Sequence, residues 1–395
     1  MPYANCYANW HRLIPVGKRR ANHEGSLTRL PNGTWQARLT YTDQATGQGK
    51  RLAFYGPTAK AAAAKMKKAR ERLDAGAPPK DATRTIADWL AHWRTTTLAV
   101  SDRAENTRSN YAALSRKHLE PEPFGAITLD RLRPTDIEKL ILALRDDGLS
   151  DSTVRSTYTV LRLALDGAVR DGLLARNPGA QVRRPGVKRR EAKHLDAGAV
   201  TAVLRAAEDS RYHTALVLAA ATGLRRGEVC ALRWDAVDLD AGTLRVISTV
   251  SRVDRRLVFS EPKTDRSRRT VPLSPAVVAM LKKHRTTQKE DRLRAGNQWT
   301  ETGFVFTTEF GTVVDPRNLL RVIQVAAKKV DVEGIGAHTL RHSAATAWLE
   351  AGVPLKIASD LLGHSSVAIT ADIYMHGSHE SARAAVDTLA SRLGL

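Results

Sequence analysis

The residues best suited to chemistry lie near the C-terminal end of this 395-residue chain. His338 and Arg341 are three positions apart, so on a helix they share one face. His364 and Tyr374 follow in the next stretch of the chain. A guanidinium binds phosphate oxygens as a fork, an imidazole transfers protons, and a phenol can attack phosphorus. This set of side chains predicts chemistry on a phosphodiester.

Two short helices are expected to position these residues. Apolar residues recur at helical spacing after Arg341 until Gly352, which is predicted to end the first helix. The second is predicted from about Pro354, as a proline in the first helical position, to Gly363. His364 then lies just beyond a helix end.

A second candidate segment lies upstream, between residues 221 and 234. A break at Gly223 followed by a new helix places Arg225 at a helix start and Glu228 one turn further on. The strands 244–250 and 255–259 are predicted to pair as a hairpin, and 269–273 is predicted as a third strand.

Lys263 is expected on the β-turn that precedes this third strand. A long side chain on a turn can reach a ligand from above. The turn itself is predicted from the segment Glu261–Asp265.

The composition points to a polyanionic partner. The formal charge is +21 and is spread along the chain rather than confined to a tail. Cys6 and Cys230 provide neither a disulfide framework nor the spacing of a zinc site, which favours a reducing compartment. Since no stretch reaches the apolar length of a membrane span, we expect a soluble intracellular protein.

The chain is predicted to be mainly α-helical and multidomain. The expected parts are a basic arm (1–24), a three-stranded β-sheet with one helix (25–76), a four-helix bundle (83–178), a basic linker (179–193) and a mostly helical domain with a small antiparallel β-sheet (194–395). Ser152 is expected to cap the last helix of the bundle.

Basic residues in two of these parts are candidates for DNA contacts. In the N-terminal sheet they alternate with apolar residues, which predicts one face on the helix and one toward phosphates or base edges. In the linker they form a continuous run. The candidates are Arg29, Arg38, Lys50 and Arg51 in the sheet and Lys188, Arg189 and Arg190 in the linker.

Five segments together resemble the signature of the tyrosine site-specific recombinases, in that family's order. They are residues 222–228, 262–264, 338–342, 362–364 and Ile373–Tyr374. The helical bundle resembles the family's core-site DNA-binding domain. The N-terminal sheet and helix are similar to the arm-site-binding domain of phage and mobile-element integrases.

The resemblance implies a role for each candidate residue. Tyr374 would be the nucleophile that forms a 3′-phosphotyrosine, and His338 would exchange a proton with it. Arg225 and Arg341 would bind the nonbridging oxygens of the phosphate, and His364 would donate a hydrogen bond to it. Lys263 would act as general acid, and Glu228 would orient Arg225 or His338. Arg226 and His342 are expected to face elsewhere. No metal and no cofactor are expected, because the guanidinium groups supply the positive charge.

The resemblance also implies the partners. The expected partners are double-stranded DNA with core and arm attachment sites, further copies of the chain in a homotetramer on synapsed DNA, an excision factor and a DNA-bending host protein. The expected location is the bacterial cytoplasm, with no membrane partner. The tail after Tyr374 has an apolar helical stripe, which we expect to dock on a neighbouring protomer; packing on its own domain is the alternative.

The sequence is also compatible with three other functions. A host chromosome-resolving recombinase shares the chemistry, but the extra N-terminal module argues against it. A type IB topoisomerase would relax DNA that lacks any specific site. A non-catalytic DNA-binding regulator could use the helices around Gly352 as a helix-turn-helix, but this leaves Arg225, Lys263 and Tyr374 unexplained.

Overall fold

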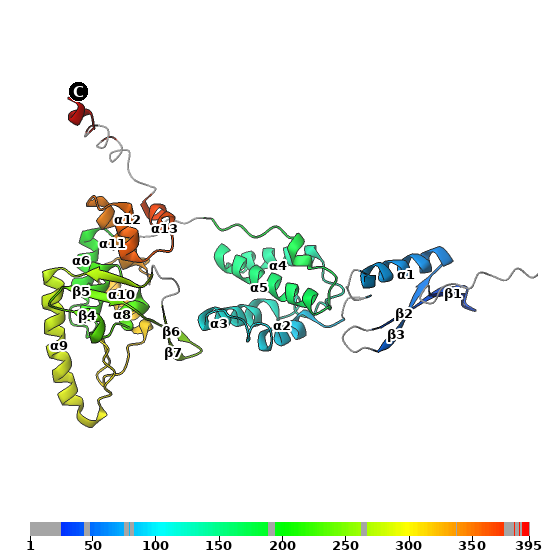
Figure 1. The fold of residues 1–395 in the computed structure, drawn as a ribbon, viewed down its shortest axis with the longest axis horizontal. Helices are drawn as coiled ribbons and strands as arrows, with labels where there is room; N and C mark the ends of the chain where they lie inside the picture. The colour runs from blue at the N-terminus through cyan, green and yellow to red at the C-terminus, as the bar shows by residue number, and fades with distance from the viewer. Residues whose placement is uncertain are drawn as a thin grey trace, which may run out of the picture. The chain divides into compact units, whose positions relative to one another are not determined.

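The computed structural model describes residues 25–42, 48–74, 79, 83–188, 194–261, 267–336, 338–374, 383, 387 and 389–394. These residues form a small sheet with one helix, an all-helical bundle and a mostly helical domain with two small sheets (Figure 1). The expected fold class, mainly α-helical with these minor sheets, is confirmed. Within the described segments no helix is long and apolar enough to cross a bilayer.

The N-terminal module is an antiparallel sheet with strand order β1-β2-β3, packed on helix α1. Its elements are β1 (Ser26–Arg29), β2 (Trp35–Thr42), β3 (Gly49–Gly56) and α1 (Ala59–Asp74). Alternate residues of β2 point toward α1, where Ala37 and Leu39 pack with Ala62, Met66 and Ala69 of the helix. This small core covers one face of the sheet and leaves the other open.

The strand register divides the basic residues of this sheet between its two faces. Arg38 pairs with Ala53, and Arg51 pairs with Thr40, so both lie on the open face. Arg29 pairs with Trp35, and Lys50 pairs with Tyr41, so both lie on the side that carries α1, although their side chains are exposed. Of the two expected faces, one on the helix and one toward DNA, the open face therefore carries Arg38 and Arg51 but not Arg29 and Lys50, because facing depends on cross-strand register as well as on alternation.

The bundle is built from four α-helices with an additional π-helical turn. They are α2 (Ile86–Thr95), α3 (Glu105–Leu114), the π-helical turn Ser115–Leu119, α4 (Pro134–Asp146) and α5 (Asp151–Arg170). Trp89 is buried in its core, and the indole Nε1 donates to the Ala164 carbonyl at 2.8 Å. Ser150, not Ser152, caps α5, since the Ser150 hydroxyl accepts from Thr153 N at 3.3 Å.

The chain that leaves the bundle stays packed against it for several residues. The 3-10 turn Pro178–Gln181 follows α5, and the Tyr158 hydroxyl donates to the carbonyls of Gly179 and Val182 at 2.9 and 3.0 Å. The first residues assigned to the linker are therefore anchored in the bundle. Lys188 is exposed, whereas Arg189 and Arg190 lie outside the described residues.

The first helices of the C-terminal domain are α6 (Ala197–Ala206), α7 (His213–Thr222) and α8 (Arg226–Cys230). Asp196 caps α6 by accepting from Ala199 N at 2.7 Å. Gly223 ends α7 in the left-handed conformation with φ 62°. The chain therefore turns sharply between α7 and α8, at the predicted break.

Two sheets follow, and they correct the predicted hairpin. Their strands are β4 (Val237–Asp238), β5 (Thr243–Val246), β6 (Thr249–Val253), β7 (Arg256–Ser260) and β8 (Arg269–Pro272). The run 244–250 is divided: β5 lies between β4 and β8 in one sheet, and β6 pairs with β7 in another. The segments that form β5 and β6 both have the composition of a strand, so the local sequence does not show where one strand ends and the next begins. Only their pairing with different strands divides them.

Helices complete this domain. They are α9 (Pro275–Ala295), α10 (Pro316–Lys329), α11 (Thr339–Glu350), α12 (Leu355–Leu362) and α13 (Val367–Tyr374). The two predicted helices around Gly352 are confirmed as α11 and α12, although Pro354 precedes the first residue of α12 rather than occupying it. One apolar core, which includes Leu218, Leu244, Phe306 and Leu340, joins α9, α10 and α11 to α7 and to the sheet that contains β5.

Candidate active site

Arg225 is positioned by the short helix that it precedes. Its backbone N–H donates to Glu228 Oε2 at 2.8 Å, and its Nη1 donates to Glu228 Oε1 at 2.7 Å. Glu228 therefore holds both the main chain and the guanidinium of Arg225. The Glu228 side chain is 5% exposed, so its charge is expensive to bury without such partners.

Arg341 lies in the first turn of α11, one helical turn after His338. Its side chain is buried, and Nη1 and Nη2 donate to the carbonyls of Gly223 and Leu362 at 2.8 and 2.6 Å. These acceptors come from the ends of α7 and α12. The Arg341 guanidinium thus links the start of α11 to the ends of α7 and α12.

His364 follows Gly363, the left-handed residue that ends α12 with φ 65°. The ring Nδ1 is 2.8 Å from the Thr370 hydroxyl, and the backbone N–H donates to the Ser359 carbonyl at 3.1 Å. In the tautomer in which Nδ1 accepts from Thr370, Nε2 carries a hydrogen that can be donated to a ligand.

These residues line one cavity of about 620 Å³. It contains five of the predicted site residues and several others: Arg225, Glu228, His338, Arg341 and His364, with Thr249, Ser260, Glu261, Ser267, His342, Gly363, Ser365 and Ile369. Tyr374 is the last residue of α13, but its side chain lies outside what the structure describes. Lys263 also lies outside the described residues.

Burial and the neighbouring cations together set the protonation of the site. Burial, then Arg341 and Arg225, lower the pKa of His364 to about 4, and the same causes in the same order lower the pKa of His338. Burial and then Arg225 lower the pKa of Arg341 to about 9, which still leaves it protonated at neutral pH. Burial alone would raise the pKa of Glu228, but Arg269 and Arg225 lower it, so the carboxylate is charged. At neutral pH the site therefore presents cationic guanidiniums beside neutral imidazoles.

His342 belongs to the same cavity, so the prediction that it faces elsewhere was wrong. Its ring centroid is 6.3 Å from that of His338, and its Nδ1 is buried without a hydrogen-bond partner among the described residues. The spacing of four residues from His338 was a signal for a shared helix face. Arg226 does not line this cavity; it lines a smaller one with Leu319 of α10, which Arg341 also lines.

Arg269 was not anticipated at all. It begins β8, its side chain is 6% exposed, and its Nη2 donates to Glu228 Oε2 at 2.9 Å. Its position in a short strand with alternating polar and apolar residues is only weak evidence for burial, because most arginines in such strands point to solvent.

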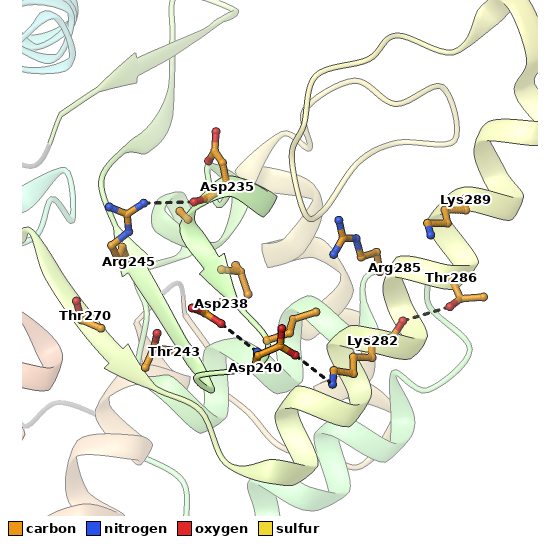
Figure 2. A pocket seen from close by; sticks show the side chains of 13 residues that line it. Asp235, Asp238, Asp240, Thr243, Arg245, Thr270, Lys282, Arg285, Thr286 and Lys289 are labelled. Atoms are coloured by element: carbon orange, nitrogen blue, oxygen red, sulfur yellow. Dashed lines mark hydrogen bonds and ion pairs between the residues drawn. The ribbon is translucent and has the colours of Figure 1, made fainter.

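A larger cavity, of about 740 Å³, contains none of the predicted catalytic residues. It lies between β4, β5 and α9, where exposed acidic and basic side chains meet (Figure 2). Lys282 Nζ is 3.9 Å from Asp240 Oδ1, and Arg245 Nη2 donates to the Asp235 carbonyl at 3.3 Å. Across the described ranges, no group of three or more His, Cys, Asp or Glu is placed to hold a metal ion.

Sequence comparisons identify the family. Residues 193–381 match the model of the phage integrase family. A tyrosine recombinase XerC-like protein of Caldanaerobacter subterraneus subsp. tengcongensis is 32% identical over 380 residues, covering 91% of this chain and 97% of that protein. An integrase of Streptomyces ambofaciens is 33% identical over 301 residues, covering 73% of this chain and 74% of that protein.

Solved structures share the fold. The Tn1549 transposon integrase, solved with a circular intermediate DNA, matches with a TM-score of 0.63 at 20% identity, over 77% of this chain and 99% of that one. The lambda integrase tetramer bound to a Holliday junction matches with a TM-score of 0.58 at 21% identity, over 90% and 96%.

The chain therefore belongs to the phage integrase family of tyrosine recombinases. Its function is that of a site-specific DNA recombinase of the mobile-element integrase type.

Proposed function

We propose that this integrase cuts and rejoins DNA at the cavity between α8, α11 and α12, with Tyr374 as the nucleophile. The observation that carries the proposal is the convergence of Arg225 and Arg341 with two neutral imidazoles, those of His338 and His364, around one cavity. Two guanidiniums can neutralise the nonbridging oxygens of a phosphodiester as charge develops.

Cleavage would proceed by in-line displacement at phosphorus. The phenol oxygen of Tyr374 forms a bond to phosphorus while the bond to the 5′-oxygen breaks, which leaves a 3′-phosphotyrosine. Neutral His338 accepts the phenol proton, and Lys263 donates a proton to the departing 5′-oxygen. Rejoining reverses these transfers, with a 5′-hydroxyl as the attacking group.

The remaining side chains would bind and orient the phosphate. His364 donates from Nε2 to a nonbridging oxygen while Thr370 holds its other nitrogen. Glu228 keeps the Arg225 fork directed at the cavity. No step requires a metal ion or a cofactor.

We extend the proposal to the other parts of the chain. Residues 25–76 would bind arm sites and 83–178 core sites, with the arm 1–24 and the linker 179–193 contacting phosphates. The protein would act as a homotetramer on synapsed DNA, with a tail docked on the neighbouring protomer, an excision factor and a DNA-bending host protein. The support is the shared fold with the lambda integrase, which was solved as a tetramer on a Holliday junction.

A nicked duplex spanning the junction between the encoding element and its chromosome tests the chemistry. A strand nick next to the cleavage position releases a short 5′-hydroxyl fragment and traps the covalent adduct. We expect a protein–DNA adduct that survives denaturation and is absent with Tyr374→Phe. Replacing Arg225 or Arg341 by Gln should slow its formation by about 10²–10³-fold.

The matched control is Tyr212→Phe, which removes the hydroxyl of another tyrosine of the same domain, in the turn before α7. It should leave adduct formation unchanged. An adduct that persisted in Tyr374→Phe would overturn the assignment of the nucleophile.

A further inference from the structure

Arg269 is buried beside the candidate site but does not line its cavity. Its Nη2 donates to Glu228 Oε2 at 2.9 Å, its Nη1 to Glu228 Oε1 at 3.3 Å and to the Ser267 carbonyl at 3.2 Å, and its Nε to the Leu361 carbonyl at 2.6 Å. Every nitrogen of the guanidinium thus has an acceptor within the protein. In this arrangement Arg269 binds protein groups rather than a phosphate.

Glu228 is shared between Arg269 and Arg225. Each of its oxygens accepts from both residues, so one carboxylate fixes the relative orientation of two guanidiniums. The Arg225 side chain is 34% exposed and faces the cavity, whereas that of Arg269 is 6% exposed and lies behind it. Arg269 therefore limits the directions in which Glu228 can hold Arg225.

The end of α12 is held by three arginines at three consecutive carbonyls. Arg269 Nε donates to Leu361 O, Arg341 Nη2 to Leu362 O and Arg225 Nη2 to Gly363 O, at 2.6, 2.6 and 3.2 Å. The last carbonyls of a helix have no partner within it and carry the negative end of its dipole, so they attract cations. His364 is the next residue of the chain.

We propose that Arg269 is a positioning residue of the recombination reaction: through Glu228 it orients Arg225, and through the Leu361 carbonyl it places the end of α12 and with it His364. This inference rests on the proposed function for the roles of Arg225 and His364. Of the three arginines, Arg269 is the one that can act only through other residues, because it does not line the cavity and each nitrogen of its guanidinium donates to a protein acceptor.

Substitutions of Arg269 in the full chain test the inference. Arg269→Gln removes the charge and most donors; Arg269→Lys keeps the charge but cannot bridge Glu228 and Leu361 as a planar fork does. With the nicked duplex described above, we expect adduct formation to slow by about 10²-fold for Arg269→Gln and by about 10-fold for Arg269→Lys, since small displacements of reacting groups have effects of this size. Affinity for the duplex and its salt dependence should not change.

The matched control is Arg245→Gln. Arg245 lies on the neighbouring strand β5, opposite Thr270, and its exposed side chain points to the other cavity (Figure 2). It should form the adduct at the wild-type rate. A double-mutant cycle with Glu228→Gln supplies a second criterion: if Arg269 acts through Glu228, the double variant should lose less than the sum of the two single losses.

A DNA-free measurement separates this inference from the proposed function. The imidazole of His364 is titrated by NMR in the histidine-labelled chain, with His364→Gln for assignment. In Arg269→Lys the local charge is kept, so a rise in the His364 pKa toward its ordinary value would report that the residue has moved from its buried position.

The outcomes are distinct. If wild type forms no adduct, the proposed function fails, while a shifted His364 titration in Arg269→Lys still supports the positioning role. If Arg269→Gln does not fold, Arg269→Lys decides. An Arg269→Lys protein that cleaves at the wild-type rate with an unchanged His364 titration would overturn the inference.

Discussion

His364 is a neutral base in a strongly cationic environment, and this contrast defines the chemistry of the site at the scale of single residues. Burial and the charges of Arg341 and Arg225 disfavour its protonated form. The same groups act on His338. At neutral pH the guanidiniums therefore carry the positive charge of the site, and the two neutral imidazoles are free to accept a proton or to donate a hydrogen bond.

The protonation of His364 predicts a pH-dependent term in stability. Its pKa is about 4 in the folded protein against 6.5 ordinarily, so the unfolded chain binds a proton first as the pH falls. Stability from this residue is therefore fully present above pH 6.5 and is lost as the pH falls from about 6.5 to about 4. The loss is on the order of 3 kcal/mol when complete.

Urea unfolding between pH 4 and pH 8 measures this term, as the difference between wild type and His364→Gln. The variant cannot take up the proton, so the difference should shrink or reverse on the acid side. A difference independent of pH would contradict the assignment of a neutral, buried His364.

At the scale of elements, the site is assembled from helix ends. Arg225 precedes α8, His338 precedes α11 and His364 follows α12. Helix termini leave unpaired carbonyls and N–H groups, and here the carbonyls of Gly223 and Leu362 accept from Arg341. The positions of these ends therefore determine where the cations lie.

Gly223 shows how closely these ends approach. A Cβ there would lie 2.8 Å from Leu362 Cδ2 and 3.3 Å from Trp348 Cη2, and φ is 62°. We expect Gly223→Ala to lower the free energy of unfolding by about 2–4 kcal/mol, from left-handed strain plus overpacking, and to slow adduct formation.

Gly352→Ala is the control for this prediction. Its φ is also positive, at 81°, but no atom lies within 4 Å of the added Cβ. In the same urea measurement, Gly352→Ala should lower the free energy of unfolding by about 1 kcal/mol, from the strain of the left-handed backbone alone. Equal effects of the two variants would show that the approach of α7 to α12 is not tight.

At the scale of the whole molecule, the charge of +21 is distributed over separately folded parts. The open face of the N-terminal sheet carries Arg38 and Arg51 with two polar neighbours. Arg38 Nε donates to Gln36 Oε1 at 2.9 Å, and Gln36 Nε2 to the Tyr55 hydroxyl at 2.8 Å. An ordered polar and basic surface of this kind suits binding to DNA.

We predict that the open face provides phosphate contacts. The double variant Arg38→Gln/Arg51→Gln should weaken binding to duplex DNA and reduce the slope of log K against log salt by about 2, in a fluorescence titration over several salt concentrations. Arg29→Gln/Lys50→Gln makes the same charge change on the side that carries α1 and should alter the slope less. An equal reduction in both pairs would favour a diffuse effect of net charge.

The elements near the C-terminus could be predicted from sequence because their signals are local. Apolar spacing, Gly352 and Gly363 predicted α11 and α12, and these helices bring His338, Arg341 and His364 near one another. The motif order was also sufficient to predict the family, which the comparisons confirmed.

Other features depend on contacts between residues far apart in the chain, which no local pattern encodes. The division of 244–250 between two sheets and the two faces of the N-terminal sheet follow from strand pairing and register. The place of Arg269 follows from a carboxylate on α8 and a carbonyl on α12, each distant in sequence. An arginine becomes a buried positioning group only where the folded chain surrounds it with acceptors, and that is a property of tertiary structure.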